Sequence, residues 1–156
     1  MKKIILTALL AMATLTGISA KEISAKKVSP KTVSDMVSDS LVDKKYFDED
    51  GELILEKNGS SFYCQVRKND NMLLFLTNFQ NDKSVAITEA KAYEVCNQWN
   101  KENIFVQAYF ANGAFTVCAY LPYDGGLKDE TLNASIDDYF IMFNRFFQHI
   151  RGKEVY

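Results

Sequence analysis

The clearest fold signal is at residues 105–121, FVQAYFANGAFTVCAYL, in which Asn112-Gly113 separates two largely apolar runs. Asn and Gly both tolerate positive φ, so the pair predicts a two-residue turn between antiparallel strands 105–111 and 114–121. Such a turn fixes the register and sorts the side chains onto two faces. One face is apolar, with the pairs Phe110–Phe115, Ala108–Val117 and Val106–Ala119. The other face holds the pairs Tyr109–Thr116, Gln107–Cys118 and Phe105–Tyr120.

Three more strands are expected before this hairpin. Leu53–Leu55 is a short apolar run, and Asn58-Gly59 after it is a second hairpin signal. Residues 62–66 alternate between apolar and polar, which predicts a half-buried strand with Cys64 among its inward side chains. Residues 72–79 are apolar on both sides, as in a central or doubly covered strand.

Three helices complete the pattern. Ser29-Pro30 supplies an N-cap and a proline at the first helical position, which predicts a helix over about 30–44. A second helix is expected over 84–100 and a third over about 128–151. The third carries an apolar stripe at i, i+3/i+4 spacing, made of Leu132, Ile136, Tyr139, Phe140, Phe143, Phe147 and Ile150. The order α-β-β-β-α-β-β-α predicts a single α+β domain with an antiparallel five-stranded sheet packed with helices.

The first twenty residues have the pattern of a secretory signal peptide. Lys2 and Lys3 precede an apolar run over 4–15, and small residues lead to Ala20. A transmembrane helix needs about 20 apolar residues, so the run favours a signal peptide, 1–20, that is removed on export. The alternative is a short membrane anchor that stays uncleaved. We expect a periplasmic or secreted protein with no membrane contact after cleavage, a flexible lead-in over 21–28 and a tail over 152–156.

Composition and charge argue against several classes of function. The formal net charge is −2, whereas nucleic-acid binders carry a basic surplus that neutralises phosphates. One His and three Cys leave few ligands for a transition metal, so no metal or cofactor is expected. His149 would have to serve any Ser-His or Cys-His pair, but its position near the end of the last helix suits an interaction with the helix C-terminus. No catalytic residue is predicted.

The second half of the chain resembles the YbjN domain family. Asn97-Gln98-Trp99-Asn100 precedes the hairpin, and Pro122-Tyr123-Asp124-Gly125-Gly126 follows it before a phenylalanine-rich helix. Members are described as bacterial sensory transduction regulators, and the element order is also similar to that of type III secretion chaperones. The resemblance covers residues 29–151. It implies a non-enzymatic module that binds protein or regulates, although the signal peptide sets this chain apart from the familiar cytosolic members.

A second class of function stays open beside that resemblance. The chain could be a small-molecule binder or an uncharacterised hydrolase that uses a cleft between the last helix and the sheet. An enzyme would need titratable groups that converge in a pocket, and the sequence offers one histidine and scattered carboxylates.

Export would place the three cysteines in an oxidising compartment. Cys64 faces inward on its strand and Cys96 lies on the packed stripe of the second helix, whereas Cys118 lies on the opposite sheet face. A disulfide needs Cα atoms within about 7 Å of each other, so these faces allow only the pair Cys64–Cys96. The alternative is three reduced thiols that behave as small apolar residues.

The candidate partner-binding residues are Tyr63, Phe105, Tyr109 and Tyr120, which share the sheet face away from the main apolar set. Aromatic rings bury much area at small entropic cost, so they suit a protein interface. If that face is open, we expect it to dock a protein partner or a second copy of the chain. The alternative is that a helix of the same chain covers it.

Overall fold

The hairpin predicted at residues 105–121 forms one edge of the main sheet. Its strands are β6 (Gln107–Ala111) and β7 (Ala114–Pro122), and the turn residues Asn112 and Gly113 have φ of 53° and 77°. The predicted register is confirmed for the pairs Phe110↔Phe115, Ala108↔Val117, Tyr109↔Thr116 and Gln107↔Cys118. Because β6 begins at Gln107, the two outermost predicted pairs lie beyond the ladder.

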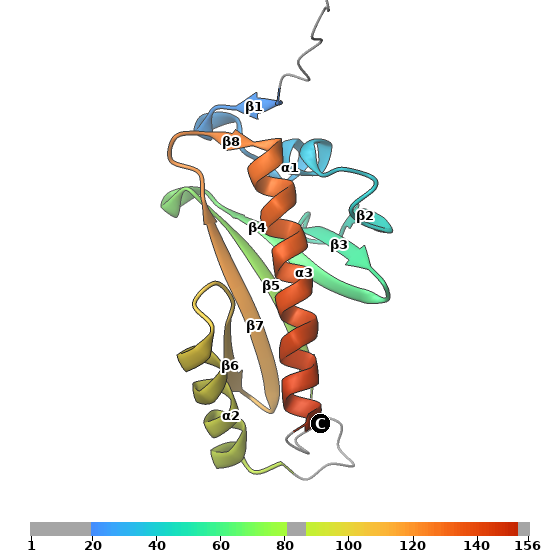
Figure 1. Cartoon of the computed structure of the whole chain (residues 1–156). Coiled ribbons are helices and arrows are strands. Elements are labelled where there is room, and N and C mark those ends of the chain that lie inside the picture. Colours follow the sequence, from blue (N-terminus) through green and yellow to red (C-terminus); the bar gives the residue numbers. More distant parts are fainter. Residues whose placement is uncertain (1–19, 81–86, 153–156) are drawn as a thin grey trace, which may run out of the picture.

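The computed structural model describes residues 20–80 and 87–152, and Figure 1 shows their α+β arrangement. The main sheet is antiparallel, with the strand order β2-β3-β4-β5-β7-β6. Its first four strands in sequence are β2 (Lys44–Phe47), β3 (Leu53–Lys57), β4 (Ser60–Arg67) and β5 (Met72–Gln80). The helices are α1 (Pro30–Met36), α2 (Glu89–Glu102) and α3 (Asp129–Gly152). A separate small sheet pairs β1 (Glu22–Ile23) with β8 (Leu127–Lys128).

The main sheet has six strands, so the predicted count of five is wrong by one. The additional strand, β2, begins where the first predicted helix was expected to end, and α1 already stops at Met36. There the Asn133 side chain of α3 accepts a hydrogen bond from Ser38 N (2.8 Å) and donates one to the Met36 carbonyl (3.0 Å). The chain therefore leaves the helix early, and residues 44–47 are free to pair with β3.

The predicted flexible lead-in, 21–28, is instead held by backbone pairing. Glu22 and Ile23 pair with Lys128 and Leu127, and a 3-10 helix, η1 (Ala25–Lys27), follows. A Cβ added to Gly126 would lie 2.7 Å from the Ile23 carbonyl oxygen, so this close approach requires glycine. The predicted signal peptide up to residue 19, the predicted helix start at 84–86 and the predicted tail from residue 153 lie outside the described residues.

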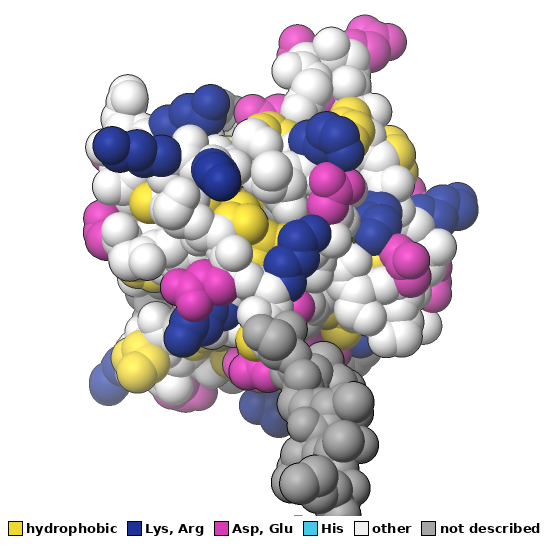
Figure 2. Space-filling model, turned by 90° about the horizontal axis from the view of Figure 1, so that it is seen from above, with side chains coloured by type: hydrophobic (Ala, Val, Ile, Leu, Met, Phe, Trp, Pro, Cys, Tyr) yellow, Lys and Arg dark blue, Asp and Glu magenta, His cyan; other side chains and the backbone are white. Residues whose placement is uncertain are grey.

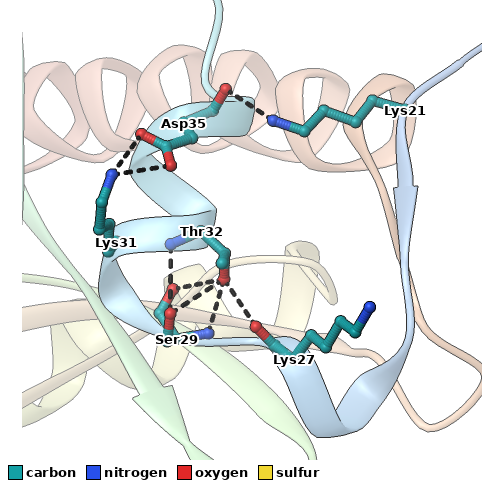
Figure 3. A network of polar contacts seen from close by, with 6 residues as sticks. All are labelled: Lys21, Lys27, Ser29, Lys31, Thr32 and Asp35. Carbon is teal, nitrogen blue, oxygen red and sulfur yellow. Dashed lines mark hydrogen bonds and ion pairs between the residues drawn. The ribbon is translucent and has the colours of Figure 1, made fainter.

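The start of α1 confirms the predicted cap. Ser29 Oγ accepts a hydrogen bond from Thr32 N (3.2 Å), and Thr32 Oγ1 accepts one from Ser29 N (2.8 Å), which completes a capping box (Figure 3). Pro30 occupies the first helical position, where no N–H is needed. Figure 3 also shows Asp35 between Lys31 and Lys21, with an ion pair of 3.0 Å to Lys31.

The core lies between α3 and one face of the sheet, as the predicted stripe requires. Phe62 and Phe75 of the sheet pack against Tyr139 of α3, with ring centroids 4.7 Å and 5.8 Å from the tyrosine ring. The buried Tyr139 hydroxyl is hydrogen-bonded to the Val117 carbonyl (2.8 Å) and to Thr77 Oγ1 (3.0 Å). Helix and sheet are thus held by apolar packing with a satisfied polar contact at its centre.

Candidate partner-binding face

All three helices contact the same face of the main sheet. Phe140 of α3 lies 4.8 Å from Phe62, and Trp99 of α2 lies 5.2 Å from Phe146 of α3, measured between ring centroids. Among the described residues, no helix lies on the opposite face, which we call the open face. It is made by Tyr46, Ile54, Tyr63, Gln65, Leu74, Leu76, Asn78, Gln107, Tyr109, Thr116, Cys118 and Tyr120.

The register places these side chains in rows that cross the sheet. One row runs through all six strands and consists of Tyr46, Ile54, Tyr63, Leu76, Cys118 and Gln107. Neighbouring rows bring Gln65, Leu74 and Tyr120 together, and Asn78, Thr116 and Tyr109. The open face is therefore a continuous surface in which apolar side chains alternate with tyrosines and amides.

The structure brings three of the four predicted binding residues onto this surface. Tyr109 and Tyr120 are 48% and 51% exposed, and Tyr63 is half-buried between them and β3. Phe105 is 38% exposed but precedes β6, so it lies outside the ladder. The apolar side chains between the rings are buried: Leu74 is 8% exposed and Ile54 is 9% exposed.

Sequence reasoning missed Tyr46, which is 42% exposed and belongs to the same surface. Its hydroxyl donates a hydrogen bond of 2.9 Å to Glu56 Oε1, and this bond raises the pKa of Tyr46. The signal was weak because Tyr46 lies in a four-residue strand that begins with two lysines. Only its pairing with Ile54 of β3 reveals the face on which it lies.

The hydroxyls of Tyr46 and Tyr120 remain neutral hydrogen-bonding groups at ordinary pH, because the pKa of each lies above the usual value for tyrosine. The neighbouring Cys118 thiol is the main cause of a raised pKa at Tyr120, followed by desolvation on burial, and Arg67 acts in the opposite direction. A hollow of about 210 Å³ lies beside this ring and is lined by Arg67, Asp70, Met72, Leu74 and Tyr120. It offers an apolar wall with one charge of each sign at its margin.

The opposite end of the open face carries a wider hollow. It has a volume of about 550 Å³ and includes Asn78, Gln80, Tyr109 and Asn112 in its lining. These groups donate and accept hydrogen bonds but include no carboxylate, histidine or cysteine. The hollow can therefore hold a polar group, and the hydroxyls of Tyr109 and Thr116 in its lining have no carboxylate or histidine beside them there to activate them.

Aromatic rings fill the space between α3 and the sheet, where the alternative function would require a cleft. Phe62, Phe75 and Tyr139 are each at most 1% exposed. His149 packs with its ring centroid 5.8 Å from Trp99 and 6.4 Å from Phe146. Within residues 20–80 and 87–152, no group of three metal-ligating side chains occurs, and no helix is long and apolar enough to cross a bilayer.

The three cysteines are buried free thiols, so the structure does not contain the predicted Cys64–Cys96 disulfide. Cys64 lies in β4, while α2 with Cys96 packs on β6, three strands away, or about 14 Å at ordinary strand spacing. Both residues face the core as expected, but at opposite sides of it. Burial raises the pKa of Cys96 to about 11 and raises that of Cys64 further, which keeps both thiols protonated.

The Asn-x-Trp-Asn motif holds the outer edge of β6. Trp99 Nε1 donates a hydrogen bond to the Val106 carbonyl (2.9 Å). Asn100 binds Ala108 twice, since its Nδ2 donates to the Ala108 carbonyl and its Oδ1 accepts from Ala108 N, both at 2.8 Å. These contacts make the motif a structural signature that joins α2 to the hairpin.

Figure 2 views the molecule from the end that holds β1, β8 and α1. Lysine and arginine side chains are interspersed there with aspartate and glutamate, and neither sign gathers into one patch. A cavity of about 470 Å³ at this end has Lys26, Lys68 and Asp124 in its lining. This mixed surface shows no selective electrostatic feature, in contrast to the aromatic composition of the open face.

An antiparallel sheet with helices packed on one face places the described part of the chain in the α+β class. The chain belongs to the YbjN family, described as "Putative bacterial sensory transduction regulator", which it matches over residues 30–152. Among solved structures it is similar to YbjN from E. coli, described as "a putative transcription regulator". The TM-score is 0.64 at 14% identity, over 81% of this chain and 94% of that chain. None of the curated proteins compared with it matches.

Proposed function

We propose that this protein is an exported, non-enzymatic regulatory module of the YbjN type, which acts by binding another protein on its open face. The observation that carries the proposal is the arrangement of all three helices on one side of the sheet. It leaves Tyr46, Tyr109 and Tyr120 between 42% and 51% exposed on the other side. The family's description as a sensory transduction regulator supports a role in binding and signalling.

The chemistry of the open face favours a protein partner. Tyrosine combines a large apolar ring with a hydroxyl and loses few rotamers on binding, which is why it is enriched at protein interfaces. The buried side chains of Leu74 and Ile54 lie between the rings and support them. The two hollows beside Tyr120 and Tyr109 would each receive a protruding side chain of the partner.

Export is the second part of the proposal and rests on the N-terminal sequence. Lys2 and Lys3, the apolar run over 4–15 and Ala20 together form a signal-peptide pattern. Cell fractionation of a C-terminally tagged chain, followed by mass spectrometry, should find a periplasmic or secreted form that begins at Lys21. A full-length form that stays in the cytoplasm would contradict export and leave the binding proposal intact.

The binding role is tested by capture from periplasmic extract. The double variant Tyr109→Ala/Tyr120→Ala should fold as the parent does and lose most of the protein that the parent retains. Tyr93→Ala is a matched control, because Tyr93 is 46% exposed and lies on α2, away from the open face. If both variants retain the same proteins as the parent, the open face is not the binding surface. Unfolding of the double variant would show that the rings serve the fold.

A further inference from the structure

The two edge strands of the main sheet, β6 and β2, differ in whether their outward backbone groups already have hydrogen-bond partners. At the β6 edge, the side chains of Trp99 and Asn100 occupy the outward carbonyl of Val106 and both backbone groups of Ala108. An unpaired edge is a template for another strand, and these side-chain contacts occupy this one at Val106 and Ala108. At the other edge, no described strand lies beyond β2. Figure 1 shows β2 at the outer end of the sheet.

A hydrogen bond at the end of β2 shows which of its residues direct their backbone N–H and C=O groups toward β3 and which direct them outward. Asp48 N donates to the Glu52 carbonyl (3.1 Å), so every second residue back from Asp48 directs its backbone groups toward β3. Tyr46 is therefore bonded inward, while Lys45 and Phe47 direct their N–H and C=O groups away from the sheet. The rings of Tyr46 and Phe47 are 42% and 45% exposed beside these outward groups.

We infer that β2 is a self-pairing edge, which joins two copies of this chain by antiparallel β2–β2 pairing about a two-fold axis at Tyr46. The outward groups of the two copies must meet, so Lys45 lies opposite Phe47 of the second copy, and Tyr46 lies opposite its own equivalent. The two main sheets become one continuous sheet. The open faces of both copies then lie on the same side of it.

Charge complementarity selects this register. It places Lys44 opposite Asp48 of the second copy. The Lys44 side chain forms an ion pair with Glu56 of its own chain (3.4 Å) and is still 72% exposed. A register centred on Lys45 would instead place Asp48 opposite Val42 and lose this charge pair. A register centred on Phe47 would require residues 49 and 50 to be extended, but they lie in the turn closed by the Gly51 N–Asp48 O hydrogen bond (3.1 Å).

The lysine at the centre of the edge does not block pairing. Edge strands are often protected by lysines that project over them. Here Lys45 Nζ is bound within its own chain, 2.6 Å from Asp39 Oδ1 and 2.9 Å from the Val37 carbonyl. Its charge is therefore already neutralised before a second copy arrives. Because β2 has only four residues, the contact is smaller than a standard interface, and the dimer should dissociate on dilution.

Sedimentation velocity of the purified protein, from about 1 μM to about 500 μM, tests the association. We expect a reversible shift from monomer to dimer as concentration rises. Phe47→Pro removes one outward N–H and leaves the ladder to β3 complete, so it should stay monomeric. Phe47→Val is the matched control, because it removes the ring, keeps the N–H and should still dimerise. A parent protein that is monomeric throughout, or a Phe47→Pro variant that dimerises like the parent, overturns the inference.

Cysteine crosslinking tests the register and does not depend on the proline variant folding. Tyr46→Cys places two thiols across the axis in a non-hydrogen-bonded pair, whose Cα separation of about 4.5 Å suits a disulfide. Lys44→Cys is the control, because its two copies would be about 13 Å apart along the strands. Mild oxidation should crosslink the first variant and not the second. Equal crosslinking of both, or of neither, overturns the register. Loss of dimerisation would leave capture through Tyr109 and Tyr120 unaffected.

Discussion

Two asparagines of one motif show how strongly the position of a residue decides its role. Asn97 and Asn100 both lie in α2, and both side chains are exposed. Only Asn100 is aligned with the edge of β6, where its amide takes the place of a neighbouring strand and satisfies both backbone groups of Ala108. An amide is well suited to this because it offers one donor and one acceptor side by side.

Replacing Asn100 with alanine should lower the free energy of unfolding by about 1–3 kcal/mol, because the N–H and C=O of Ala108 lose their partners. Asn97→Ala is the matched control and should change it by less than about 0.5 kcal/mol. Both substitutions gain the same helix propensity, so that gain cancels in the comparison. Urea unfolding measures both values. Equal effects at the two positions would show that the Asn100 contact is not what stabilises the edge.

Among the helices, α1 is short because a side chain of α3 binds the backbone groups through which α1 would otherwise continue. Asn133 of α3 accepts from Ser38 N, donates to the Met36 carbonyl and also donates to the Asp129 carbonyl of its own helix (2.7 Å). This one side chain ends α1, ties it to α3 and directs the chain toward β2. The edge strand at the far end of the sheet thus depends on a contact between two helices.

Asn133→Ala should destabilise the protein by about 1–3 kcal/mol, since it leaves the end of α1 without its partner. Amide hydrogen exchange should show the loss of protection concentrated in α1 and the following segment. Asn144→Ala on the same helix removes only a local bond to the Phe140 carbonyl and should have a small effect. A loss of protection spread evenly over the sheet would contradict this role for Asn133.

At the scale of the whole molecule, a single apolar core joins every helix to the main sheet. Trp99 links α2 to β6 through its indole N–H and to α3 through Phe146. Phe62 and Tyr139 link α3 to the other half of the sheet. Because these clusters are continuous, no helix can leave the sheet without exposing the core of its neighbour.

The chain should therefore unfold in one cooperative transition. Trp99 is the only tryptophan, so its fluorescence reports the α2–β6–α3 junction, whereas far-ultraviolet circular dichroism reports all helices and strands. The two urea transitions should coincide, as two-state unfolding of a small domain requires. A fluorescence transition that precedes the loss of circular dichroism would show that α2 and the hairpin form a separate unit.

The two faces of the β6–β7 hairpin, the stripe of α3 and the cap of α1 could all be predicted from the sequence, because each depends on residues close together in the chain. The turn conformation of Asn112-Gly113 alone sets the pairing of Tyr109 with Thr116. The alternation of side chains along each strand likewise predicts that Tyr63, Tyr109 and Tyr120 share one sheet face. Local sequence patterns were therefore sufficient to predict that part of the candidate site.

The remaining features were decided by contacts between distant residues. Asn133 ended α1, pairing with β3 made β2 a strand, and pairing with β8 ordered the lead-in. The order of strands separated Cys64 from Cys96, although both face the core. Local patterns determine what a segment can form and which side it buries. Only tertiary packing decides which segments meet, because backbone groups and apolar faces find their partners across the whole chain.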